Sequence, residues 1–298
     1  MKKQLAFAGA FLTSAFCFLP LVLLAQTTPP STEVFLAPLQ WTNSSVTVGV
    51  PVNISNNPGY DNQPSFLPDS SAVIFASNRD AKQNDIYKYD IASKQLIQLT
   101  KTAENEYSPL VSTDGRSILT VHGTEQSIFR YDLDGGNPRL AYQHGAALIG
   151  YHVWTSPTEF AAFILGSGGT PATLQVIDTT TGKGVTIESN IGRSLLRRVG
   201  HNTISFVSKT DPQKWIIKEF DITTKAVSAI TETVARSEDL TWLPDGRIVM
   251  ASGSKLFVWQ AGGAGWAEFA DLTSAGIKRI TRLSASRDGK HLAIVGEL

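Results

Sequence analysis

Short stretches of alternating apolar and polar residues, separated by turn-forming residues, run along most of the chain. Residues 85–90, 127–132 and 217–221 alternate with a period of two, and each stretch ends in an aspartate. Residues 72–77 form a strand-like apolar run directly after a turn. A period of two between regular turns is typical of short β-strands, and no stretch shows a helical period. The pattern therefore predicts an all-β protein.

The same turn chemistry recurs about every 44 residues. Four copies place an aspartate before a small residue: Pro68-Asp69-Ser70, Thr113-Asp114-Gly115, Pro244-Asp245-Gly246 and Arg287-Asp288-Gly289. Weaker copies at Pro157 and His201 complete a series whose members lie 43 to 45 residues apart. Repeats of this length, each with four strands, are the blades of β-propellers. The sequence predicts a six-bladed β-propeller of four-stranded antiparallel blades.

Large apolar residues stand three positions before four of these turns. They are Phe66, Val111, Trp154 and Trp242. Because the two tryptophans occupy matching positions of the repeat, we expect them to belong to the core between blades and not to a stacking platform for a ligand.

The two ends of the chain are expected to share one blade. The last repeat stops at Leu298 after two strands, and residues 33–54 read as a third and a fourth strand. Pairing of the N-terminal strands (33–54) with the C-terminal strands (277–298) would close the ring and leave no open sheet edge. Deleting either segment is then expected to unfold the whole domain.

The N-terminus has the layout of a secretory signal. Lys2 and Lys3 precede an uncharged apolar run over residues 5–25 that ends in small residues. We expect residues 1–25 to be a signal peptide, residues 26–298 to be the propeller, and the protein to be periplasmic or secreted. Removal of the signal leaves no membrane span and no cysteine, because Cys17 lies within it. An uncleaved membrane anchor is the alternative, since the run approaches the length that spans a bilayer.

Charge and composition narrow the class of partner. The 298 residues carry 26 basic and 26 acidic side chains, so no basic field is available for nucleic acid. The five histidines have no partner at the spacing of a zinc site. We expect no resident metal or other cofactor.

Several motifs resemble those of a known family. Residues 64–69 (Pro-Ser-Phe-Leu-Pro-Asp), 74–79 (Ile-Phe-Ala-Ser-Asn-Arg), 85–87 (Asp-Ile-Tyr) and 98–100 (Gln-Leu-Thr) resemble the blade motif of TolB-like six-bladed propellers. The resemblance implies an exported propeller that binds other macromolecules and has no chemistry of its own. It covers the propeller only, because the N-terminal α/β domain of TolB has no counterpart in this sequence. Similar blades accompany a hydrolase domain in prolyl oligopeptidases, but Gly-x-Ser-x-Gly does not occur in the chain.

Candidate site residues lie mainly six to eight positions before each turn, where the chain enters the innermost strand. Symmetry should bring these positions to one mouth of the central channel, where propellers build binding sites from loops on a rigid ring. From the first blade to the sixth, they are Asp61, Asn62 and Gln63; Glu106, Tyr107 and Ser108; Tyr151 and His152; Arg193 and Ser194; Glu238 and Asp239; Arg279 and Arg282.

Ring order separates two groups among these candidates. The acids Glu238 and Asp239 of the fifth blade stand between the arginines of the fourth and sixth, so ion pairs between blades are the simpler interpretation. Glu106 and His152 have no arginine nearby in this scheme, and two tyrosines accompany them. We therefore expect the contact with a ligand or partner to lie in the sector of Glu106, Tyr107, Tyr151 and His152.

Two functions from different classes fit this sequence. The first is a monomeric binding or scaffold module for a protein, peptide or glycan partner in the bacterial cell envelope. The alternative is a small enzyme of the hydrolase or lactonase type. It would use Asp61, Glu106 and Glu238 at the channel mouth to hold a divalent cation such as calcium, or for acid and base catalysis. The first is favoured because the chain contains no catalytic motif.

Overall fold

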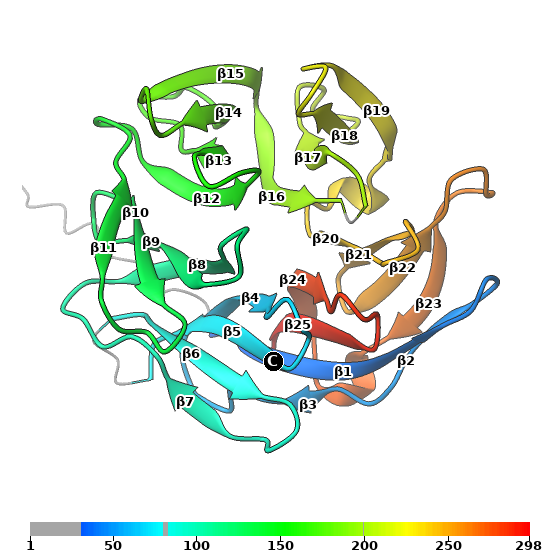
Figure 1. Cartoon of the computed structure of the whole chain (residues 1–298). Coiled ribbons are helices and arrows are strands. Elements are labelled where there is room, and N and C mark those ends of the chain that lie inside the picture. Colours follow the sequence, from blue (N-terminus) through cyan, green and yellow to red (C-terminus); the bar gives the residue numbers. More distant parts are fainter. Residues whose placement is uncertain (1–30, 80–82, 199) are drawn as a thin grey trace, which may run out of the picture.

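The computed structural model describes residues 31–79, 83–198 and 200–298, and these residues form a ring of six β-sheets around a central channel (Figure 1). Every pair of neighbouring strands within a sheet is antiparallel. The predicted six-bladed β-propeller is therefore confirmed. The predicted signal peptide at residues 1–25 lies outside the described residues.

Five blades are built from consecutive strands, ordered from the channel outwards. The first contains β4 (Asp61–Phe66), β5 (Ala72–Ser77), β6 (Asp85–Asp90) and β7 (Leu96–Gln98). The second contains β8 (Glu106–Val111), β9 (Ser117–His122), β10 (Ser127–Asp132) and β11 (Arg139–Tyr142). The third contains β12 (Ile149–Trp154), β13 (Glu159–Ile164), β14 (Thr173–Asp178) and β15 (Lys183–Ser189). The fourth contains β16 (Ile191–Arg197), β17 (Thr203–Ser208), β18 (Ile216–Asp221) and β19 (Val227–Glu232). The fifth contains β20 (Leu240–Trp242), β21 (Ile248–Ser252), β22 (Lys255–Trp259) and β23 (Ala267–Asp271).

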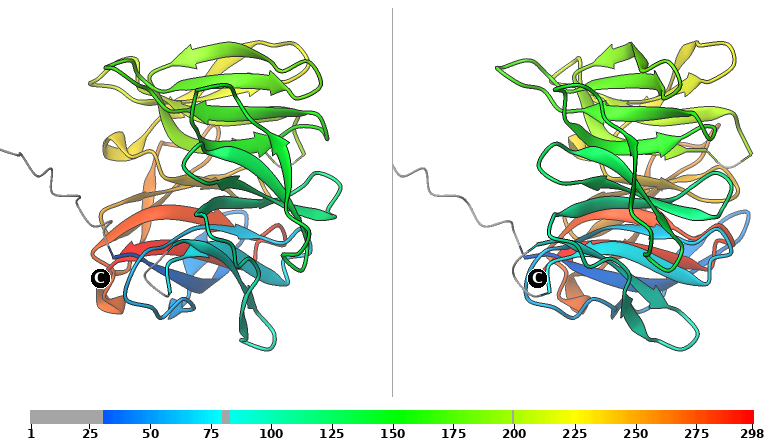
Figure 2. Two further views of the ribbon diagram at one scale, coloured as in Figure 1. Left: turned by 90° about the vertical axis from the view of Figure 1, so that its left-hand side faces the viewer. Right: turned by 60° about the vertical axis from the view of Figure 1, so that its left-hand side comes forward.

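The sixth blade joins the two ends of the described chain, as the sequence predicts. Its inner strands are β24 (Arg279–Ala285) and β25 (His291–Glu297), and β1 (Glu33–Trp41) pairs with β25 from Glu33 opposite Gly296 to Pro38 opposite His291. The outer edge consists of two short strands on β1, β2 (Val46–Val48) and β3 (Val52–Asn53). Figures 1 and 2 show β1 in blue beside β25 in red.

The recurring aspartate turns connect the first and second strands of their blades. In each one, a carboxylate oxygen of the aspartate accepts a hydrogen bond from the backbone N–H two residues later, as Asp69 does from Ser71 at 3.0 Å and Asp114 from Arg116 at 3.1 Å. The residue after the aspartate has a positive φ, 72° at Gly115 and 64° at Ser70. Glycine adopts this conformation without steric cost, which explains why the turn recurs as Asp-Gly.

The hydrophobic core lies between the blades. Trp154 of the third blade packs with Leu119 and Ile128 of the second, and the indole N–H of Trp242 donates a hydrogen bond to Ser205 Oγ of the fourth blade at 2.8 Å. The interpretation of both tryptophans as inter-blade core is confirmed.

Helical structure is limited to two turns of 3₁₀ helix, Val234–Arg236 and Thr273–Ala275, in the part of the chain that the structure describes. Within that part no helix is long and apolar enough to cross a bilayer.

Candidate functional site

Irregularities in the innermost strands aim side chains at the channel. The pairing of the first two strands shifts register between Asn62 and Ser65 in the first blade, and between Tyr107 and Leu110 in the second. Within these bulges Gln63 has a φ of 58° and Ser108 a φ of 50°. A bulge bends a strand and redirects its side chains, and residues held in the left-handed region often mark a functional site.

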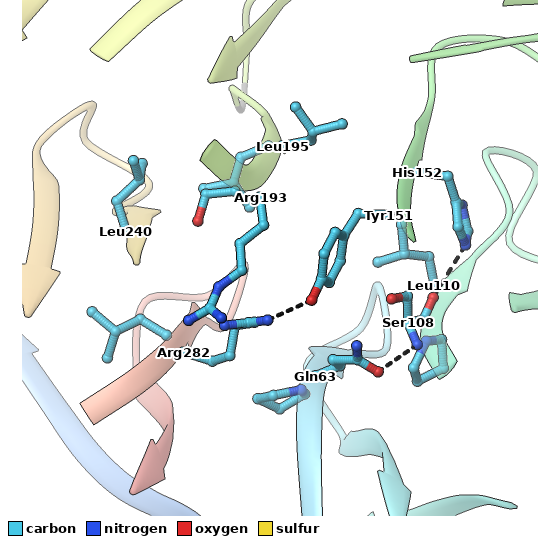
Figure 3. A pocket seen from close by; sticks show the side chains of 14 residues that line it. Gln63, Ser108, Leu110, Tyr151, His152, Arg193, Leu195, Leu240 and Arg282 are labelled. Carbon is cyan, nitrogen blue, oxygen red and sulfur yellow. Dashed lines mark hydrogen bonds between the residues drawn. The ribbon is translucent and has the colours of Figure 1, made fainter. Parts of the chain in front are cut away.

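A cavity of about 100 Å³ lies where the six innermost strands begin, and we call it the channel mouth (Figure 3). All six blades contribute to it. Its lining residues are Gln63, Pro64, Ser108, Pro109, Leu110, Tyr151, His152, Arg193, Ser194, Leu195, Leu196, Leu240, Arg282 and Leu283.

Two arginines of the channel mouth converge on one carboxylate from the blade between them. Arg193 Nη2 donates to both oxygens of Asp239, at 3.1 and 3.2 Å, and Arg282 Nη1 donates to Oδ1 at 3.2 Å. Both guanidinium groups also donate to the backbone carbonyl of Thr281, at 3.1 and 2.7 Å. Burial raises the pKa of Asp239 while the two arginines oppose that shift.

Glu238 neutralises the other side of Arg193. Its carboxylate lies 3.5 Å from Arg193 Nε and 3.6 Å from Lys209 Nζ, and it accepts the backbone N–H of Arg193 at 3.1 Å. A Cβ atom at Gly192 would lie 2.6 Å from this carboxylate, so only glycine allows the approach. The expected ion pairs between the acids of the fifth blade and the arginines of its neighbours are present.

Tyr151 is fixed against Arg282 across the channel. Arg282 Nη2 donates to the Tyr151 hydroxyl at 2.6 Å, and the guanidinium carbon lies 5.3 Å from the ring centroid (Figure 3). The ring also meets Phe163 edge to face, with centroids 5.6 Å apart. A side chain held at both ends loses little conformational freedom when a ligand binds.

A hydrogen-bonded chain connects the first three blades beside the channel mouth. The side-chain carbonyl of Gln63 accepts the backbone N–H of Ser108 at 2.8 Å, and His152 Nε2 lies 3.1 Å from the backbone carbonyl of Ser108. Trp154 donates its indole N–H to His152 Nδ1 at 3.2 Å. Burial lowers the pKa of His152 to about 4, so the ring is neutral and donates from Nε2.

Glu106 lies behind the channel mouth, fully buried between the first and second blades. It accepts hydrogen bonds from Thr100 Oγ1 at 2.9 Å, from Tyr131 Oη at 3.3 Å and from the Thr102 hydroxyl. Burial, and secondarily the carboxylate of Asp85, raise the pKa of Glu106 to about 7. Its carboxylate is thus occupied by the protein itself. Tyr107 lies beside it, and its hydroxyl accepts from Asn84 Nδ2 at 3.0 Å.

Asp61 and Asn62 lie at the junction of the sixth and first blades, the place that Glu106 and Tyr107 occupy between the first and second blades. Asp61 Oδ2 accepts from Asn57 Nδ2 at 3.1 Å, and Asn62 Nδ2 donates to the Thr32 hydroxyl at 3.3 Å. Both side chains are buried, and burial raises the pKa of Asp61 to about 6. Arg279 lies elsewhere again, in an exposed ion pair with Glu297 of the neighbouring strand.

The structure therefore brings seven of the fourteen candidates into the lining of the channel mouth: Gln63, Ser108, Tyr151, His152, Arg193, Ser194 and Arg282. Asp239 and Glu238 hold the arginines from outside the lining. Of the expected contact sector, Tyr151 and His152 line the cavity, and a contact with a partner there stays a prediction.

Sequence reasoning missed the apolar residues of the channel mouth. Pro64, Leu110, Leu195, Leu240 and Leu283 stand four to six positions before their turns, one in each of five blades. The recurrence of an apolar residue at this place in the repeat was the available signal.

The carboxylates of the enzymatic alternative occupy separate places. Asp61 and Glu106 lie at different blade junctions, and Glu238 lies beside Arg193 and Lys209. Among the described residues, no three acidic, histidine or cysteine side chains gather in a way that could hold a metal ion.

A second cavity, of about 300 Å³, lies at the other end of the innermost strands, next to the aspartate turns. Its lining includes Trp154, Trp242, Arg197 and Arg287. It shares Pro64, Leu110, Leu195, Leu196 and Leu283 with the channel mouth, so these apolar residues separate the two ends of the channel.

Comparison with known proteins finds similarity in structure alone. No family model and no curated protein matches the sequence. A putative TolB from Agrobacterium tumefaciens is 15% identical with a TM-score of 0.65, and the match covers 91% of this chain and 99% of that one. An oligogalacturonate lyase from Vibrio parahaemolyticus is 13% identical with a TM-score of 0.54, over 90% of this chain and 98% of the lyase.

TolB from Acinetobacter baumannii is 16% identical with a TM-score of 0.56, over 90% of this chain. The match covers 64% of that TolB, so this chain spans less than two thirds of its length. Structural similarity at such low sequence identity shows a shared fold but does not show a shared activity, because one fold hosts many functions. The protein thus has the six-bladed propeller fold of the TolB-like structures, and its described residues contain no N-terminal α/β domain.

Proposed function

We propose that the protein is an exported, monomeric binding module that engages a protein or peptide partner in the bacterial cell envelope through its channel mouth. In this proposal it acts in the periplasm or after secretion. The similarity to a TolB and a putative TolB supports an envelope role, and the secretory layout of residues 1–25 supports export.

The observation that carries the proposal is the network of hydrogen bonds that holds the polar side chains of the channel mouth in place. Arg193, Arg282 and Tyr151 come from three different blades, and Asp239 and the Thr281 carbonyl fix the two guanidinium groups. A preorganised cluster of arginine and tyrosine over apolar residues is typical of the centre of an interface, because such side chains contribute most to affinity when little motion is lost.

The enzymatic alternative has less support from the same place. Among the residues that the structure describes, no carboxylate lines the channel mouth, and both ring nitrogens of His152 are engaged by the protein. Acid and base catalysis requires a titratable group within hydrogen-bonding reach of the substrate. A glycan partner remains an outcome of the test below.

Site-specific crosslinking in cells tests the binding role. A photoreactive amino acid is placed at Ser194, in the channel mouth, and as a matched control at Val185, an exposed residue of the outer strand β15. We expect a discrete protein adduct from position 194 that is absent at position 185. Equal labelling at both positions, or no protein adduct at position 194, contradicts the proposal. An adduct to polysaccharide alone would identify a glycan as the partner instead of a protein.

A further inference from the structure

The atoms of the channel mouth that are free to bind a ligand are mostly hydrogen-bond donors. Within the described part of the chain, Arg193 Nη1 and Gln63 Nε2 have no acceptor, although other atoms of both side chains are engaged. The Tyr151 hydroxyl accepts from Arg282 and keeps its own proton for a further partner. Since none of the described residues that line the cavity carries a carboxylate, a ligand that supplies acceptors fits best.

The charges around the channel mouth also favour an acceptor that is negative. Arg193, Arg282 and Lys209 contribute three positive charges, and Asp239 and Glu238 contribute two negative ones, so one positive charge remains. The two acids lie outside the lining while the guanidinium groups of Arg193 and Arg282 border the cavity. Hydrogen bonds from arginine to an ionised acceptor are stronger than those to a neutral one, which makes a carboxylate a suitable partner for the free Nη1 of Arg193.

The floor of the same cavity is apolar and narrow. Leu110, Leu195, Leu240 and Leu283 converge there with Pro64. The space of about 100 Å³ is smaller than the roughly 150 Å³ cavity that holds benzene in another protein. One aliphatic side chain suits this space, whereas a sugar ring would place hydroxyl groups against leucine at a desolvation cost.

We propose that the channel mouth captures the free C-terminus of a protein or peptide whose last residue is aliphatic. This inference rests on the proposed binding function and names the chemical group that is bound. The terminal carboxylate accepts from Arg193, Gln63 and Tyr151, and the terminal side chain enters the leucine-lined floor. A free C-terminus supplies both groups from one residue.

The first experiment compares ligands on the unmodified protein. A fluorescein-labelled peptide ending in Ala-Ala-Leu is titrated by anisotropy, first with a free terminal carboxylate and then as its terminal amide, with oligogalacturonate as a third probe. Hydrogen bonds to a charged partner should make the free acid bind roughly tenfold or more tightly than the amide. Equal affinity of acid and amide, absence of peptide binding, or binding of oligogalacturonate alone overturns the inference.

The second experiment locates the effect on the protein. Arg282→Gln removes one of the two guanidinium charges that border the cavity and the donor that holds the Tyr151 hydroxyl in place. It should therefore reduce the preference for acid over amide by roughly tenfold. The matched control is Arg279→Gln, which alters an arginine of the same strand β24 that pairs with Glu297 outside the cavity. If Arg282→Gln does not fold, Tyr151→Phe removes only the hydroxyl group. An unchanged preference in a folded variant refutes the assignment, while the crosslink from position 194 reports independently on binding.

Discussion

Arg247, in the fifth blade, donates a hydrogen bond from Nη2 to the carbonyl oxygen of Thr42 at 2.9 Å, although the two residues lie 205 positions apart in the sequence. The same guanidinium donates to Asp245 Oδ2 from Nε at 2.7 Å and to the Ser45 carbonyl at 3.4 Å. Thr42 and Ser45 belong to the turn between β1 and β2, the outer part of the closing blade. Arg247 therefore fastens the N-terminal segment to the neighbouring blade.

Replacing this arginine should weaken closure of the ring. Arg247→Met keeps the aliphatic stem but removes the charge-assisted hydrogen bonds, and we expect the free energy of unfolding to fall by about 2 kcal/mol. Urea denaturation measures the change. The matched control is Arg116→Met, because Arg116 follows Asp114 as Arg247 follows Asp245 but has an exposed side chain. Equal stability of the two variants would show that the contact with Thr42 contributes nothing.

Truncation tests the closure itself. A chain that ends at residue 276 lacks β24 and β25, and the buried side chains Leu292, Ile294 and Val295 leave the core with them. We expect the truncated protein to lose its cooperative thermal transition, measured by circular dichroism. Removal of Leu298 alone, which is exposed, should leave the transition intact. A soluble truncated protein that melts cooperatively would exclude closure by the chain ends as the source of stability.

The fold could be predicted from the sequence because the blades repeat a similar pattern of turn residues and alternating apolar and polar positions. An aspartate turn fixes the connection of the first two strands in four of the blades, and period-two alternation marks the third strand, so the copies reinforce one another. The two ends could be assigned to one blade because each supplies only half of the four strands.

The site could be predicted only in part, because the bulges change which side chain faces the channel. Counting back from the turn predicts Asp61 and Glu106 at the mouth. These two residues begin β4 and β8, and their side chains instead face the junction with the preceding blade. Side chains two to four positions later, such as Gln63 and Leu110, reach the cavity. No periodicity in the sequence shows where a bulge occurs, since it depends on the pairing of two strands.

Neutralising Asp239 should destabilise the ring at the channel mouth. In Asp239→Asn the guanidinium groups of Arg193 and Arg282 stay close together without their shared carboxylate. Because both arginines are partly exposed, we expect a loss of about 2 kcal/mol in unfolding free energy, less than for a fully buried pair. High salt should restore part of it by screening the repulsion. The reference is Glu268→Gln, which breaks an exposed pair with Lys255 and should change the melting temperature little. If Asp239→Asn melted at the same temperature as Glu268→Gln, the stabilising role of Asp239 would be contradicted.

Glu106 gives the protein a stability that depends on pH. Its ordinary pKa of 4.5 is raised to about 7 because the carboxyl group is buried, with the charge of Asp85 as a further cause. The folded state therefore holds a proton that the unfolded chain releases, and unfolding becomes easier as pH rises from 4.5 to 7. The total change is on the order of 3 kcal/mol. Asp61, with a pKa raised to about 6, acts in the same direction.

Substituting Glu106 should remove most of this dependence. Glu106→Gln stays neutral at every pH, so we expect its unfolding free energy to fall less between pH 5 and 8 than that of the unmodified protein. The variant should therefore gain stability relative to the unmodified protein as pH rises. Urea denaturation at each pH unit measures both curves, with Glu125→Gln at an exposed position as the control. Parallel curves would mean that Glu106 is ionised in the folded protein, and the buried proton between the first two blades would have to be assigned to another group.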